Sequence, residues 1–75
     1  MLIYELIERK NNTSIYKYYP EGNTSYPGVV SVTQNGSDIS GEIIELSPID
    51  EFKTYAYQAI YGKKYVESKG TIAWY

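Results

Sequence analysis

The sequence predicts an α+β domain, in which an antiparallel sheet of four to five strands has one helix packed across it in the order ββββαβ. Up to Leu46, short runs of apolar, aromatic and β-branched residues alternate with turn residues, which is typical of strands joined in hairpins. Beyond Leu46, apolar residues recur at spacings of three, four and seven, which indicates one face of a helix. A final short strand is expected at residues 71–75. The length of 75 residues favours a single domain, residues 1–75.

Turn residues and a proline set the limits of the strands. Strands are expected at residues 2–9, 14–19, 29–33 and 39–46. Pro20 ends the second of them. Asn35 and Gly36 tolerate the positive φ angles of a type I′ turn, so the third and fourth strands should form an antiparallel hairpin. Ser40 and Gly41 weaken the start of the fourth strand or mark a bulge.

The helix is expected to begin at Ser47. Serine is a favourable N-cap, Pro48 then occupies the first helical position, and Asp50 follows the cap by three residues. The residues expected on its core face are Phe52, Tyr55, Ala56, Ala59 and Ile60. Gly62 ends the helix, or the helix continues through Glu67.

A stripe of tyrosines falls on the helix face opposite the core. With an advance of about 100° per residue, the three rings lie at about 140°, 180° and 220° from Phe52. One helix face suffices to cover a sheet, so these rings are surplus to folding and, beside lysines, have the composition of a protein interface. The residues of this predicted partner-binding stripe are Tyr57, Tyr61, Tyr65, Lys53 and Lys64. Alternatively the tyrosines merely tolerate exposure, or the helix breaks at Gly62 and no stripe forms.

A second hypothesis places a binding site on the sheet. Tyr16, Tyr18 and Tyr19 lie on one predicted strand, near Asn11 and Asn12. Aromatic rings on a sheet can stack against sugars or bases, and asparagine side chains supply hydrogen bonds. These residues predict, as the alternative to a protein interface, a small-ligand or carbohydrate site.

The composition narrows the possible chemistry. The chain has no His and no Cys, which excludes the commonest general base near neutral pH, a cysteine nucleophile and thiolate or imidazole metal sites. The carboxylates lack the spacing of a calcium loop, and the six glycines form no phosphate-binding motif. We therefore expect a protein that is not an enzyme and that binds no metal and no cofactor.

Charge is divided unevenly along the chain. Residues 1–51 carry 8 acidic and 3 basic side chains, a net charge of −5, whereas residues 52–75 carry 1 acidic and 4 basic, a net charge of +3. The acidic part opposes binding to nucleic acid, so the expected partner is a protein or a second copy of this chain. No apolar run of membrane-spanning length and no signal peptide is evident, so we expect a cytoplasmic protein without membrane contact.

Short motifs extend over nearly the whole chain. They are YYPEG at 18–22, DEF followed by YA and Ala59 from residue 50, and Gly70 before AWY at 73–75. In these motifs the sequence resembles a group of small uncharacterised proteins from low-GC Gram-positive bacteria and their mobile elements, which have no assigned activity. The resemblance implies a bacterial or phage protein. One form of the interface hypothesis is then a mobile-element inhibitor that presents acidic sheet residues to a basic groove of a host enzyme. Those residues are Glu5, Glu8, Glu42 and Glu45.

Overall fold

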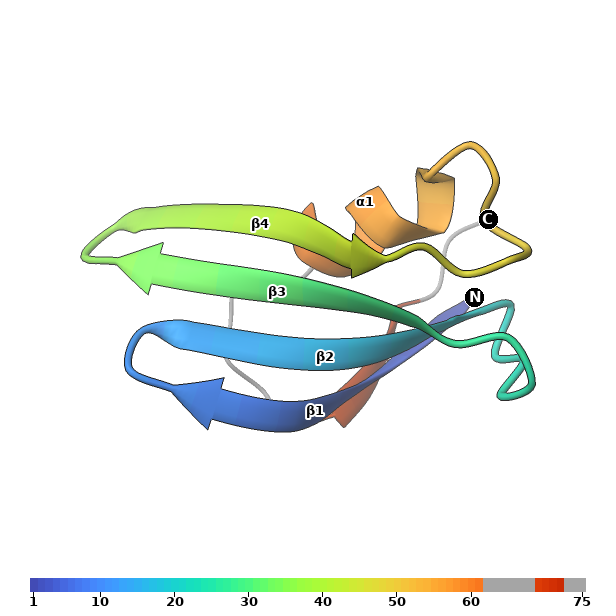
Figure 1. Ribbon diagram of the computed structural model, residues 1–75, viewed down its shortest axis with the longest axis horizontal. Helices are drawn as coiled ribbons and strands as arrows, with labels where there is room; N and C mark the ends of the chain where they lie inside the picture. Colours follow the sequence, from blue (N-terminus) through green and yellow to red (C-terminus); the bar gives the residue numbers. More distant parts are fainter. Residues whose placement is uncertain (62–68, 73–75) are drawn as a thin grey trace.

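The computed structural model describes the backbone of residues 1–61 and 69–72 and the side chains of residues 1–60 (Figure 1). The elements are β1 (Leu2–Lys10), β2 (Thr13–Pro20), β3 (Gly28–Asn35), β4 (Asp38–Glu45), α1 (Thr54–Tyr61) and β5 (Lys69–Ile72). This order confirms the predicted α+β class and the arrangement ββββαβ. β5 begins two residues before the predicted final strand, and both the continuation of the helix past Gly62 and residues 73–75 lie outside the described residues.

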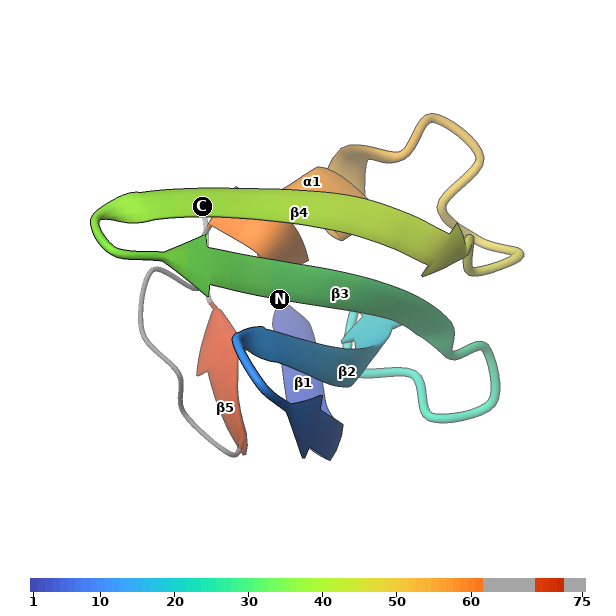
Figure 2. The same ribbon diagram turned by 60° about the vertical axis from the view of Figure 1, so that its left-hand side comes forward.

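The strands form one antiparallel sheet in the order β4-β3-β2-β1-β5. Consecutive strands from β1 to β4 are therefore neighbours, as expected of hairpins and short connections. Figures 1 and 2 show a strongly twisted sheet with α1 packed across one face, and α1 contacts each of the first four strands. Among the strands that the structure describes, β4 and β5 stand at the two edges of the sheet.

The core lies between this face of the sheet and α1. Strand residues alternate between the two faces, and the helix contributes positions three and four residues apart. The buried apolar residues are Leu2, Tyr4, Tyr16, Tyr18, Val30, Val32, Ala56, Ala59 and Ile60. The ring of Tyr4 meets that of Tyr16 edge to face, with 5.8 Å between centroids and an interplanar angle of 79°. Three of the five residues predicted for the core face of the helix are thus confirmed as buried.

Gly41 of β4 lies directly against Ile60 of α1. A Cβ atom at Gly41 would lie 2.0 Å from Cγ2 of Ile60, so any larger residue would push α1 away from the sheet. The sequence suggested a bulge near this glycine, but the register of β4 shifts at Ile44, between the partners of Val29 and Val30. Ile44 is exposed there, because it follows the partly buried Ile43 and neighbouring strand residues point to opposite faces.

The β3–β4 hairpin turns one residue later than predicted. Asn35 is the last residue of β3 and pairs with Asp38, so the loop consists of Gly36 and Ser37. Gly36 has a φ of +62° and Ser37 does not have a positive φ. A positive φ at the first loop position alone is the pattern of a type II′ turn rather than type I′.

Candidate functional site

The connection from β4 to α1 consists of two successive turns, and the predicted helix start at Ser47 is wrong. The amide of Asp50 donates to the carbonyl of Ser47 over 3.0 Å, and the amide of Lys53 donates to the carbonyl of Asp50 over 2.9 Å. Lys53 has a left-handed φ of 61°, and α1 begins at the next residue, Thr54. Figure 1 shows this loop (yellow to orange) projecting beyond the sheet beside the start of α1.

Asp50 provides the cap that the sequence assigned to Ser47. Its side chain is 2% exposed. One carboxylate oxygen accepts the amide of Tyr55 over 2.9 Å, and the other accepts the amide of Ala56 over 2.6 Å. These amides belong to the first turn of α1, where N–H groups lack partners within the helix and a negative charge is favourable. A buried carboxylate therefore sets the position at which the helix begins.

The hydroxyl of Tyr18 connects this loop to the sheet. It accepts the amide of Ser47 over 3.0 Å and donates to the carboxylate of Asp50 over 3.3 Å. Burial, together with the negative charge of Asp50, raises the pKa of Tyr18 to about 12. The hydroxyl of Ser47 donates to the backbone carbonyl of Tyr26 over 2.6 Å. Ser47 is thus buried between two loops and does not cap the helix.

A further contact joins the helix to the end of β2. The hydroxyl of Tyr55 donates to the carboxylate of Glu21, and this hydrogen bond is the main reason that the pKa of Tyr55 is raised. The other carboxylate oxygen of Glu21 lies 3.8 Å from the amino group of Met1. Together with Asp50, this contact fixes both the first turn of α1 and the loop that precedes it.

The fixed loop presents an exposed aromatic side chain. Phe52 is 82% exposed, although the sequence placed it in the core. That prediction was wrong because it assumed a helix continuous from Ser47, whereas the turns before Thr54 point this residue outward. Tyr57 is 46% exposed, and Lys53 is exposed one helical turn before it. We call Phe52, Lys53 and Tyr57 the helix-start surface.

The structure describes only part of the predicted tyrosine stripe. Tyr57 faces outward on α1, as expected, whereas Lys53 precedes the helix. Tyr61 is the last residue of α1, and its side chain lies outside the described residues, as do Tyr65 and Lys64. The partner-binding role of these residues stays a prediction.

The alternative surface of strand tyrosines requires correction. Tyr16 is 2% exposed and Tyr18 is 0% exposed, so both rings belong to the core and are closed to a ligand. Tyr19 is half-buried on the other face of the sheet, where it pairs with Ile3. Neighbouring strand residues point to opposite faces, so these rings could not form one surface. The three rings therefore do not form the single exposed surface that this hypothesis assumed.

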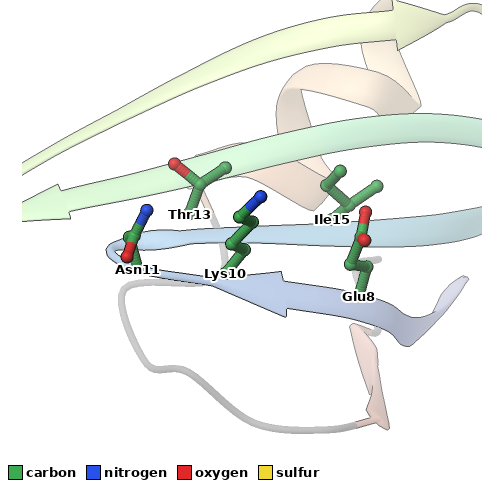
Figure 3. Close-up of a pocket in the computed structure, with 5 residues that line it drawn as sticks. All are labelled: Glu8, Lys10, Asn11, Thr13 and Ile15. Atoms are coloured by element: carbon green, nitrogen blue, oxygen red, sulfur yellow. The ribbon is translucent and has the colours of Figure 1, made fainter.

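A shallow depression of about 310 Å³ lies at the end of the β1–β2 hairpin. Figure 3 shows its lining side chains along one side of the hairpin. They are Glu8, Lys10, Asn11, Thr13 and Ile15. The depression combines one acid, one base and two polar groups over an isoleucine and contains none of the predicted tyrosines.

Within residues 1–61 and 69–72, no cluster of three or more acidic side chains is placed to hold a metal ion, and no helix has the length and apolarity needed to cross a membrane. Comparison of the chain with protein-family models, with curated proteins and with solved structures found no match.

Sequence reasoning missed the exposure of Phe52, although a signal for it was present. Ser47 and Asp50 are both good N-cap residues, and each is followed by residues that suit a first turn. Pro48 favoured the earlier start. The later start depends on the hydroxyl of Tyr18, which reaches both the Ser47 amide and the Asp50 carboxylate from a strand 29 and 32 residues away in sequence.

Proposed function

We propose that this chain is a non-enzymatic protein-interaction module and that the helix-start surface contacts its partner. One observation carries the proposal: a phenylalanine ring that is 82% exposed stands on a loop fixed by a buried carboxylate. Such a ring adds almost nothing to folding. Its burial against a partner would contribute about 1.5–3 kcal/mol.

The fixed loop also lowers the entropic cost of binding. Ordering a loop or a side chain on association reduces affinity, and a surface held in its bound geometry avoids that cost. The left-handed Lys53, a conformation costly for a residue with a Cβ atom, is maintained by the hydrogen bonds of Asp50. Aromatic residues beside a cation are the composition common at the centre of interfaces.

The two tyrosines with raised pKa values favour a binding role for this chain over a catalytic one. Tyr18 and Tyr55 are the described groups with raised pKa values. Tyr18 has no exposed surface, and the hydroxyl of Tyr55 donates a hydrogen bond to Glu21 in a contact that supports the fold. Both hydroxyls are thus engaged in hydrogen bonds that hold α1 and the loop before it against the sheet.

A more particular form of the proposal is the mobile-element inhibitor. The strand register supports it by placing the four acidic sheet residues on the face away from α1, in two rows across β1 and β4. Lys17 lies between Glu5 and Glu45 in one row, and Ile15 lies between Glu8 and Glu42 in the other. The inhibitor form predicts a basic partner, whereas the general form requires only an aromatic contact.

The test is a variant that removes both exposed rings, Phe52→Ser with Tyr57→Ser. It is expected to fold with a free energy of unfolding within about 1 kcal/mol of the native chain, because both side chains are exposed. We expect it to lose a protein that the native chain captures from a lysate of the producing cell, or to lose self-association measured by sedimentation.

The matched control replaces two other exposed apolar residues, Ile7→Ser with Tyr26→Ser. This control is expected to keep the partner. If both double variants recover the same proteins and sediment like the native chain, the helix-start surface is not the contact surface. If both double variants lost the partner equally, binding would depend on exposed apolar side chains in general, and this result would also contradict the proposal.

A further inference from the structure

We propose that the outer edge of β4 is a second contact site, which takes an extended basic segment of another protein as an additional antiparallel or parallel strand. Within the described residues β4 has one strand neighbour, β3, and it stands at the end of the sheet. Seven of its eight residues are exposed, more than in any other strand whose side chains are described. The proposal concerns a different element from the helix-start surface and does not rest on the function proposed for that surface.

The register of the hairpin indicates which backbone groups face outward. Asn35 and Asp38 flank a two-residue loop, and the residues flanking such a turn form a hydrogen-bonded pair. Antiparallel pairs then alternate, so Ser40 and Glu42 direct their amides and carbonyls toward β3. Their neighbours Ile39, Gly41 and Ile43 direct their own amides and carbonyls to the open edge instead. These three residues provide the hydrogen-bonding positions that an added strand would use.

The side chains of β4 specify the charge of the occupant. The strand DISGEIIE carries three acids and no base, a net charge of −3. The register places Asp38 and Glu42 on the face away from α1, while Gly41 and Ile39 lie on the helix side. Side chains of an added strand lie beside residues of the same face, so lysine or arginine at alternate positions would meet the acids.

The same charges argue against a second copy of β4 as the occupant. Antiparallel pairing of two β4 strands would set −3 against −3, and like charges opposite each other destabilise a sheet. The bulge at Ile44 limits the regular part of the edge to residues 38–43. The fitting occupant is therefore a segment of about six residues that alternates basic and apolar side chains, supplied by a different protein.

Edge strands also carry charges and bulges simply to prevent aggregation. The experiment separates this protective role from a docking role. The ¹⁵N-labelled native chain is titrated with an eight-residue peptide that alternates lysine and valine, capped at both ends. Amide hydrogen exchange is measured residue by residue, with a peptide of four lysines followed by four valines and an alternating glutamate–valine peptide as controls.

We expect the alternating basic peptide to bind in the millimolar range or tighter and to slow exchange at the amides of Ile39, Gly41 and Ile43. The variant Asp38→Lys with Glu42→Lys should weaken this binding by about tenfold or more. A control with the same change in net charge, Glu8→Lys with Glu51→Lys, should weaken it much less. Ile39→Pro should also weaken it, because proline removes an outward amide while an edge strand tolerates it.

Three results would overturn the proposal. One is the absence of slowed exchange at these three amides at millimolar peptide. Another is equal binding by the alternating and block peptides, which would show attraction by charge alone. The third is a dimer of the native chain in which the same three amides are slowed, since the occupant would then be a second copy. None of these results bears on Phe52, so the two proposals fail separately.

Discussion

Replacement of Asp50 by alanine is expected to lower the free energy of unfolding by about 3–5 kcal/mol, the largest effect of any single substitution described here. The change leaves three donors without their acceptor: the amides of Tyr55 and Ala56 and the hydroxyl of Tyr18. Each buried polar group left without a partner costs about 1–3 kcal/mol. A domain of this size has a total stability of roughly 4–11 kcal/mol, so the variant is expected to be largely destabilised at 37 °C.

The measurement is urea unfolding followed by circular dichroism. Glu51→Ala is the matched control, because Glu51 is the adjacent acid and is exposed. The control should stay within about 0.5 kcal/mol of the native chain. Asp50→Asn should fall between the two, since an amide keeps one acceptor but turns a donor toward the remaining partners. An Asp50→Ala variant as stable as the control would show that the carboxylate does not hold the start of α1.

The second large effect is the loss of stability at alkaline pH that Tyr18 causes. Its pKa is raised from 10.0 to about 12, so between these values the folded chain keeps a proton that the unfolded chain has released. The stabilising contribution is therefore complete below pH 10 and is lost as the pH rises toward 12. The expected loss is about 1–3 kcal/mol.

Tyr18→Phe isolates the contribution of this one hydroxyl from the other effects of alkaline pH. At pH 7 the variant should be less stable by about 1–3 kcal/mol, because the amide of Ser47 loses its acceptor and the carboxylate of Asp50 loses a donor. The difference between the two chains should shrink from pH 10 to pH 12. Unfolding curves that stay equally far apart at every pH would contradict the assigned role of the hydroxyl.

The sheet could be predicted from the sequence because its signals are local. Alternating apolar residues, β-branched runs and turn residues indicated the first four strands within two residues of their observed ends. The β3–β4 turn shifted by one residue because glycine accepts a positive φ in either position of the loop, whereas Asn35 continues the ladder by pairing with Asp38. Local sequence patterns therefore predict the presence of a hairpin better than the exact residues that form its turn.

The candidate site could be predicted only in part because its geometry depends on distant contacts. Tyr57 was assigned outward from helical periodicity alone, and it is exposed. Phe52 was misplaced because two residues compete to cap the helix and the hydroxyl of Tyr18, on β2, determines the outcome. The expectation that the tyrosines of β2 form one surface failed for a different reason. The two-residue period of a strand places Tyr18 and Tyr19 on opposite faces of the sheet, so a dense run of rings on one strand does not make one surface.

The central claim is that Phe52 stands in solvent on a loop fixed by Asp50, and the unfolding free energy of Phe52→Ser tests it most directly. For a ring that is 82% exposed, we expect the variant to unfold within about 0.5 kcal/mol of the native chain. A helix that began at Ser47 would place this ring in the core, where its loss would cost about 3–5 kcal/mol. A loss of that size would contradict both the observed start of α1 and the helix-start surface.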